Sequence, residues 1–207
     1  MDVKLKICGM AQAANIAEVA SLQPDYLGFI FYPKSPRCIS LLSAELIKYV
    51  PSTIKTTGVF VNEEIEIVKR HINTFHLKAV QLHGTESPTF CTEIKQTGVE
   101  VIKAFGIDTN FDFEQFIPYL TDVDYFLFDT QTPSHGGSGK VFDWTLLSNY
   151  NLEKPFFLSG GIDLSHVDAL KAIQHRWLYA LDINSKFEFE AGLKNVEKIK
   201  EFMQMLF

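Results

Sequence analysis

Eight short apolar runs recur along the chain of 207 residues, and a longer stretch with amphipathic spacing follows each of them. Most of the runs are continuously apolar rather than alternating, which is typical of parallel strands that are covered on both faces. We therefore predict strands at Lys4–Ile7, Tyr26–Phe31, Thr57–Val61, Ala79–Leu82, Val99–Ala104, Tyr125–Asp129, Phe156–Leu158 and Trp177–Asp182. The apolar spacing of the intervening stretches predicts helices at Ala11–Leu22, Ala44–Val50, Glu63–Phe75, Ser87–Gln96, Phe113–Leu120, Trp144–Asn149, Ser165–Ala172 and Leu193–Leu206.

This strict alternation predicts the fold class α/β, with a single (β/α)8 TIM barrel that spans residues 1–207 as one domain. Eight units in this length give about 26 residues each, which is close to the minimum for such barrels. A doubly wound open sheet is the alternative, but that fold usually stops at about five or six strands. The sequence contains no linker rich in Pro, Gly or Ser, so we predict no second domain.

The charge balance and the cysteines exclude several classes of protein. The 19 Lys and Arg residues against 25 Asp and Glu residues give a formal charge of −6, which argues against a nucleic-acid partner because such binding needs a basic surface. No apolar run approaches the roughly 20 residues of a membrane span, so no membrane partner is expected. Three cysteines without a CxxC motif argue against disulfides and structural zinc, and a reduced, cytoplasmic setting is expected. The six His residues form no recognised metal motif, so no metal is predicted.

Polar residues at the carboxyl ends of the predicted strands are the candidates for catalysis, because barrel active sites collect there. Cys8 follows the first strand, His83 follows the fourth, and Asp129 ends the sixth. A thiol in this position serves as a base or nucleophile if a cation or a helix N-terminus favours the thiolate, although Cys is also a common small core residue. Burying an unpaired carboxylate is costly, so Asp129 is a candidate proton donor, with a loop cap as the alternative. His83 either contacts a ligand or has a structural role.

Two further loop regions suit anionic ligands. Two prolines stiffen the loop around Arg37, and a rigid arginine suits a carboxylate, although a solvated basic turn is the alternative. In such barrels, the loops after strands seven and eight commonly bind phosphate. These loops contain Ser159-Gly160-Gly161 and Asp182-Ile183-Asn184-Ser185. Because glycine lets backbone N–H groups approach an anion, we predict a phosphate site there.

Seven short motifs run in order from residue 4 to about residue 188, and together they resemble the phosphoribosylanthranilate isomerase family of tryptophan biosynthesis. The motifs are Lys6-Ile7-Cys8-Gly9, Gly28-Phe29-Ile30-Phe31-Tyr32-Pro33-Lys34-Ser35-Pro36-Arg37, Gly58-Val59-Phe60-Val61-Asn62, Val80-Gln81-Leu82-His83-Gly84, Phe128-Asp129-Thr130, Gly136-Gly137-Ser138-Gly139-Lys140 with Phe142-Asp143-Trp144, and Leu158-Ser159-Gly160-Gly161-Ile162.

The resemblance implies a (β/α)8 barrel that performs an Amadori rearrangement without a cofactor. In this reaction N-(5-phosphoribosyl)anthranilate becomes 1-(2-carboxyphenylamino)-1-deoxyribulose 5-phosphate. The family's motif cysteine matches Cys8 as general base, and its strand-six aspartate matches Asp129 as general acid. Its arginine in the second loop matches Arg37 as the group that meets the anthranilate carboxylate. The remaining residues expected to contact this small phosphorylated substrate are His83, Gly160, Gly161, Asp182, Asn184 and Ser185.

The loop after the eighth strand departs from the family pattern, which resembles Asp-Val-Ser-Ser-Gly-Val-Glu. Here the run is Asp182-Ile183-Asn184-Ser185-Lys186-Phe187-Glu188. Lysine in place of glycine makes a positive φ harder to adopt, which puts the backbone geometry of the phosphate site in question. Alternatively, Lys186 adds a cation near the phosphate. The sequence leaves the choice between a monomer and a homodimer open.

Three other functions remain alternatives. The Amadori isomerase of histidine synthesis is expected to use carboxylates as both acid and base, and Cys8 argues against it. Indole-glycerol-phosphate synthase is expected to show a catalytic lysine and glutamates at strand ends, which the predicted strands lack. A barrel that only binds a phosphorylated ligand is the third alternative, and the presence of both Cys8 and Asp129 argues against it.

Overall fold

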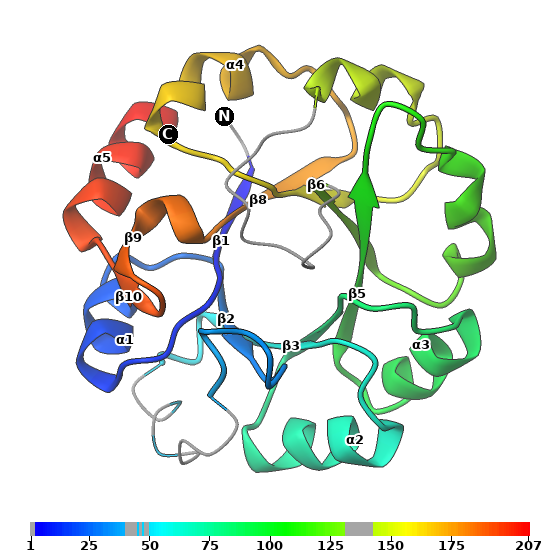
Figure 1. The fold of residues 1–207 in the computed structure, drawn as a ribbon, viewed down its shortest axis with the longest axis horizontal. Coiled ribbons are helices and arrows are strands. Elements are labelled where there is room, and N and C mark those ends of the chain that lie inside the picture. Colours follow the sequence, from blue (N-terminus) through cyan, green and yellow to red (C-terminus); the bar gives the residue numbers. More distant parts are fainter. Residues whose placement is uncertain (1–2, 40–44, 46, 48–49, 131–142) are drawn as a thin grey trace.

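The computed structural model describes residues 3–39, 45, 47, 50–130 and 143–207. Its eight parallel strands are hydrogen-bonded in chain order and close into a barrel, because β1 pairs with β8 as well as with β2. Figure 1 looks into this ring and shows the helices around its outside. The predicted α/β barrel is therefore confirmed. The strands are β1 Lys4–Ile7, β2 Tyr26–Ile30, β3 Lys55–Phe60, β4 Ala79–Leu82, β5 Glu100–Ile107, β6 Tyr125–Thr130, β7 Phe156–Leu158 and β8 Leu178–Ile183.

The connections that follow most strands are helical, although several of them are shorter and tighter than predicted. The α-helices are α1 Ala13–Ala20, α2 Ile65–Thr74, α3 Pro88–Lys95, α4 Val167–Ala172 and α5 Val196–Leu206. Among the described residues, 3-10 helices take the place of α-helices after β5 and β6, namely η2 Phe113–Tyr119 and η3 Trp144–Asn149. Two shorter 3-10 helices lie beside other elements: η4 Leu164–His166 directly precedes α4, and η5 Ser185–Phe187 follows β8. Pro118 explains the 3-10 form of η2, because proline removes an N–H donor that an α-helix needs. Most of the helix predicted at 44–50 lies outside the described residues.

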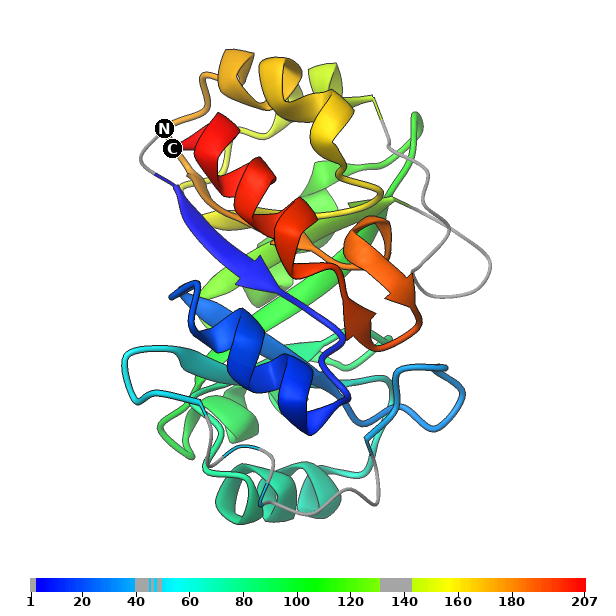
Figure 2. The ribbon, with the colours of Figure 1, turned by 90° about the vertical axis from the view of Figure 1, so that its left-hand side faces the viewer.

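A short antiparallel hairpin after β8 was not predicted. It consists of β9 Glu188–Glu190 and β10 Leu193–Lys194, and it lies at the end of the barrel toward which β1 points (Figure 2). The helix predicted from Leu193 therefore begins only at Val196. Its start is set by Asn195, whose side-chain oxygen accepts a hydrogen bond from the Lys198 N–H.

Alternation along the strands divides the buried side chains into two sets. Large rings and small side chains fill the inside of the barrel, where Tyr26, Leu127 and Phe157 contact Ala79, Ile102, Ala104 and Ala180. The opposite faces of the strands join a larger apolar cluster with the helices. A side chain at the carboxyl end of a strand therefore lies above a filled barrel interior, at the site where barrel enzymes bind substrate. Among the described helices, none has both the length and the apolar character needed to cross a membrane.

Candidate active site

Cys8 lies directly after β1, at the carboxyl end of the barrel. Its N–H donates to the Ile183 carbonyl of β8, so the backbone continues the sheet to this point. The thiol is buried, with 4% of the residue exposed. Gly28 on β2 provides the space for it, because a Cβ at Gly28 would lie 2.7 Å from Cys8 Sγ.

The electrostatic surroundings of Cys8 combine burial with two cations. Burial raises the pKa of the thiol above its ordinary value, and the positive charges of Lys6 and Lys194 oppose this effect without cancelling it. The ammonium groups of Lys6 and Lys194 therefore act on Cys8 in the direction that favours the thiolate. The sequence predicted the position of the thiol, whereas it did not indicate which cations would surround it.

Lys6 and Asp182 form a buried ion pair next to Cys8. Lys6 Nζ lies 2.9 Å from Asp182 Oδ2, and the two residues are paired in register across β1 and β8. Burial raises the pKa of Asp182, although Lys6 opposes this shift. Asp182 Oδ1 is buried and has no hydrogen-bond partner among the described residues. An unpartnered buried oxygen is costly, so this atom is a candidate acceptor for a hydroxyl group of the substrate.

Asp129 is the second-last residue of the apolar strand β6, and 8% of the residue is exposed. Its Oδ1 accepts the Thr130 N–H at 2.8 Å, and its Oδ2 lies 3.4 Å from His83 Nε2. His83 Nδ1 in turn lies 3.0 Å from Gln81 Nε2 on β4. The predicted strand-end residues His83 and Asp129 are therefore neighbours, and Asp129 lies close enough to Asp182 to contribute to the raised pKa of that carboxyl, whose main cause is burial.

A cavity of about 580 Å³ opens at the carboxyl ends of β4, β5 and β6. His83, Asp129 and Thr130 line one part of it, and the rings of Phe105, Phe111 and Tyr119 line another. Asp129 and His83 therefore face open space that can hold a small molecule, lined by aromatic rings together with polar side chains such as Asp108 and Asn110.

Arg37, in the loop after β2, is held by Glu188 at the start of β9. Arg37 Nε donates to Glu188 Oε1 and Oε2 at 2.9 and 3.0 Å, and its Nη2 donates to Oε2 at 2.6 Å. Lys194 also donates to Glu188 Oε1 at 2.6 Å. One edge of the guanidinium is thus occupied by a carboxylate of the protein itself, which fixes the orientation of the group.

The Glu188 ion pairs predict a pH dependence of stability. Burial favours the neutral acid, but the hydrogen bonds and charges of Arg37 and Lys194 outweigh it and hold the pKa of Glu188 below its ordinary 4.5. A lowered pKa means that these pairs stabilise the fold above that pH and are lost as pH falls through the folded-state pKa. We expect the free energy of unfolding to fall more steeply below about pH 4.5 in the wild type than in Glu188→Gln. Urea unfolding from about pH 6 to pH 3 tests this, and parallel curves would contradict it.

The predicted phosphate residues lie at the ends of β7 and β8. Gly160 and Gly161 have positive φ angles of +89° and +66°, a region that favours glycine. A Cβ on Gly160 would also lie 2.7 Å from the Thr130 nitrogen and 2.9 Å from Asp129 Oδ1. Gly160 is therefore needed to bring the β7 loop against the end of β6.

The loop after β8 shows how Lys186 fits at a position where the family pattern has glycine. Asn184 precedes η5, and its Oδ1 accepts a hydrogen bond from Lys194 Nζ at 2.7 Å. Ser185 and Lys186 belong to η5 itself, and Lys186 is not among the described residues with positive φ. Because the backbone is not left-handed there, lysine fits where the family pattern has glycine. Burial opposes ionisation of Asp163, but the ion pair with Lys198 and, to a smaller extent, the charge of Lys186 lower the pKa of that carboxyl.

Three charged residues of the site were missed by the sequence analysis: Lys6, Glu188 and Lys194. Lys6 carried a usable signal, because a lysine inside an apolar strand must find a buried partner. Glu188 and Lys194 belong to the hairpin of β9 and β10. The sequence pattern predicted a loop at Glu188 and a helix at Lys194, so it did not indicate that the two residues face the site. The glycine-rich motif at Gly136–Lys140 lies outside the described residues.

Comparison with known proteins connects this geometry with one family. A sequence profile of N-(5'-phosphoribosyl)anthranilate isomerase matches residues 5–205. The chain is 43% identical over 204 residues to the isomerase of that name from Parabacteroides distasonis, covering 98% of this chain and 92% of the relative. The chain belongs to the N-(5'-phosphoribosyl)anthranilate isomerase family. The predicted enzyme class, an isomerase of tryptophan biosynthesis, is thereby confirmed.

Solved structures of the family have the same fold. The crystal structure of the Thermotoga maritima isomerase superimposes with a TM-score of 0.86 at 35% identity, covering 99% of this chain and 98% of that one. A family structure at 31% identity, with a TM-score of 0.82 and coverage of 99% and 98%, contains reduced 1-(o-carboxyphenylamino)-1-deoxyribulose 5-phosphate. The Thermotoga maritima enzyme is dimeric and has also been converted to monomers.

Proposed function

We propose that this chain isomerises N-(5-phosphoribosyl)anthranilate with Cys8 as the general base and Asp129 as the general acid. The observation that carries this assignment is the placement of both groups at the carboxyl end of one barrel, around the same buried ion pair. Cys8 is electrostatically coupled to Lys6 and Asp182, and Asp182 is coupled to Asp129 and His83. Two proton-transfer groups are therefore arranged around one site, as the rearrangement requires.

The reaction begins at the oxygen of the furanose ring. Asp129 donates a proton to this oxygen, the bond from the oxygen to C1 breaks, and the nitrogen lone pair forms the C1–N double bond of an iminium ion. The Cys8 thiolate then removes the proton from C2. The two electrons of that C–H bond form the C1–C2 double bond and neutralise the nitrogen, which gives an enolamine. Transfer of the O2 hydroxyl proton to the Asp129 carboxylate, and of the proton now on Cys8 to C1, yields the ketone and restores both groups, so the product is an isomer of the substrate.

The electrostatics of the site suit the base step. Cys8 acts as the thiolate, and Lys6 and Lys194 supply positive charge that stabilises this form against the effect of burial. A buried cation acts strongly because water does not screen it. Lys6 is itself held in its charged form, since Asp182 and Cys8 outweigh the effect of burial and raise the pKa of Lys6.

The remaining predicted residues suit the two anionic ends of the substrate. Arg37 is assigned to the anthranilate carboxylate, with Glu188 as the residue that orients it. The phosphate is assigned to backbone N–H groups of the loops at Gly160, Gly161, Asn184 and Ser185. His83 and the unpartnered Asp182 Oδ1 are assigned to the hydroxyl groups of the sugar. With these roles, the ligand is a small phosphorylated molecule. We also propose that the protein is cytoplasmic and forms a monomer or a homodimer.

Turnover of freshly prepared phosphoribosylanthranilate, followed by its fluorescence, tests the proposed function. We expect loss of the anthranilate fluorescence with saturation kinetics and no added cofactor. The aminoaldose of histidine synthesis serves as the second substrate, because its turnover alone would favour that pathway's isomerase. Tight binding of the product analogue without turnover would instead identify a barrel that only binds a phosphorylated ligand.

Removing Arg37 is expected to weaken substrate binding more than the chemical step. The Arg37→Ala variant should raise KM at least about tenfold with kcat within about threefold of the wild type, because a carboxylate contact remote from C1 and C2 contributes similarly to ground and transition states. Steady-state kinetics give both constants. Lys34→Ala, in the same loop, is the matched control and should leave KM near the wild-type value. An unchanged KM in Arg37→Ala would show that another group holds the carboxylate.

A further inference from the structure

One buried charged pair has no role in the reaction described so far, although one of its members, Lys103, is among the residues that line the cavity beside His83 and Asp129. Lys103 on β5 and Glu86, in the loop before α3, are 1% and 6% exposed. Ile102 and Ala104, on either side of Lys103, belong to the cluster inside the barrel. Since side chains alternate along a strand, Lys103 points to the opposite face, away from the barrel interior.

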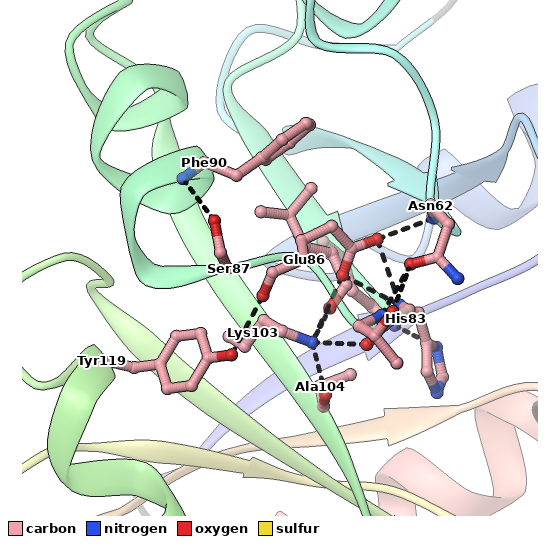
Figure 3. A network of polar contacts seen from close by, with 12 residues as sticks. Asn62, His83, Glu86, Ser87, Phe90, Lys103, Ala104 and Tyr119 are labelled. Atoms are coloured by element: carbon pink, nitrogen blue, oxygen red, sulfur yellow. Dashed lines mark hydrogen bonds and ion pairs between the residues drawn. The ribbon is translucent and has the colours of Figure 1, made fainter.

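Lys103 binds the backbone on both sides of His83. Its Nζ donates to the Leu82 carbonyl at 3.3 Å and to the Gly84 carbonyl at 2.8 Å. It also donates to the Ala104 carbonyl at 3.0 Å and lies 3.3 Å from Glu86 Oε2. Figure 3 shows these contacts meeting at the Lys103 nitrogen, next to His83. The ammonium group has three protons and four oxygen neighbours, so its bonding capacity is filled by the protein itself.

Glu86 fixes the same segment from its other side. Its two carboxylate oxygens accept the Gly84 N–H at 3.1 and 3.0 Å, and Oε1 also accepts the Asn62 N–H at 2.9 Å. Asn62 Oδ1 accepts the Thr85 N–H at 2.7 Å. A Cβ on Gly84 would lie only 2.3 Å from Asn62 Oδ1, so this close approach requires glycine. Figure 3 shows that Asn62 reaches this cluster from a different loop than Glu86.

Stability alone is a weak explanation for this pair. Burying two charges costs free energy, and a well-packed apolar pair in the same space is often at least as stable. What the two charges do specifically is hold the carbonyl before His83, the carbonyl after it and the amide of Gly84. These three bonds fix the backbone on either side of His83, whose ring lies 3.4 Å from Asp129 Oδ2 and 3.0 Å from Gln81 Nε2.

We propose that Lys103 and Glu86 are positioning residues that hold the His83 imidazole against Asp129. The effect on the reaction rests on the proposed role of Asp129 as the acid, whereas the placement of His83 can be measured without turnover. A displacement of about 1 Å at a reacting group can cost about a hundredfold in rate. The pair thus acts through His83 rather than by contact with substrate.

The test removes both charges together, so that neither is left buried alone. The double variant Lys103→Met/Glu86→Gln is expected to lower kcat about ten- to hundredfold while retaining cooperative unfolding. The matched control is Lys55→Met/Glu100→Gln, which removes the Lys55–Glu100 ion pair at the amino end of the same strand β5. That control should leave kcat within about twofold of the wild type.

A double-mutant cycle with His83→Ala separates positioning from a general structural effect. If the pair acts through His83, the Lys103→Met/Glu86→Gln change lowers kcat by less than about twofold once His83 is absent. The ring nitrogen signals of His83 in the NMR spectrum provide the second readout. They should shift in the pair variant and stay in place in the control.

Two results would overturn the proposal: a loss of kcat that persists in full in the His83→Ala background, or unchanged His83 signals in the pair variant. Failure of the proposed function gives a different result. In that case the wild type would not turn over phosphoribosylanthranilate, whereas the NMR signals of His83 would still report the position of the His83 ring.

Discussion

Replacing Cys8 with alanine is expected to lower kcat by at least about 10²–10⁴-fold, the usual contribution of a general base. The thiol lies beside the ammonium of Lys6, whose positive charge favours the thiolate. Alanine removes one sulfur atom from a buried position, so the fold should persist with a modest loss of stability. Stopped-flow or steady-state fluorescence measures the rate, and thermal unfolding checks the fold.

Two companion variants make the Cys8 result specific. Cys8→Ser retains a small polar group that is a far weaker base, so its kcat should also fall by at least about a hundredfold. Cys38→Ala removes another free thiol, the half-buried one in the loop after β2, and should leave kcat near the wild-type value. A Cys8→Ala variant with near-normal kcat would remove Cys8 from the mechanism.

The Asp129→Asn variant is expected to show a loss of the same size in kcat. In the wild type, Asp129 Oδ1 accepts a hydrogen bond from the Thr130 N–H at 2.8 Å. Asparagine retains the shape of the side chain and an oxygen that can accept the same bond. It cannot donate an acidic proton to the ring oxygen, so ring opening loses its catalyst. KM should change by less than about threefold, because only an interaction with the transition state is removed.

The control for Asp129 lies at the other end of β6. Asp124 precedes this strand, and its carboxylate accepts the Val101 N–H at 2.8 Å and pairs with Lys95. Asp124→Asn makes the same chemical change away from the site and should leave kcat unchanged. If the two variants lose activity equally, the effect of Asp129→Asn is one of folding and not of acid catalysis.

The barrel and the catalytic candidates could be predicted because both depend on local pattern. Continuous apolar runs predict buried parallel strands, and all eight runs became strands within a few residues of the predicted bounds. Cys8 and Asp129 stood out since each follows or ends such a run, and parallel strands bring their carboxyl ends to one face of the barrel. Neither inference required knowledge of distant contacts.

The charged framework of the site could not be predicted, since each of its pairs joins distant parts of the chain. Lys6 and Asp182 are 176 positions apart, and Arg37 and Glu188 are 151 apart. The register of β5 decides whether the side chain of Lys103 points into the barrel or toward the outer face of the strand. The residues of the two pairs become neighbours only when β1 pairs with β8 and closes the barrel. The sequence pattern predicts that the barrel closes, but it does not specify which residues lie opposite each other.

The most direct test of the account is a crystal structure of this chain with the reduced product analogue, 1-(o-carboxyphenylamino)-1-deoxyribulose 5-phosphate. The account predicts Cys8 Sγ within about 3.5 Å of C2, Asp129 on the other side of the sugar near the former ring oxygen, and the phosphate on the loops of Gly160 and Ser185. A sugar that lies with C2 out of reach of Cys8, or with both groups on one side, would contradict it.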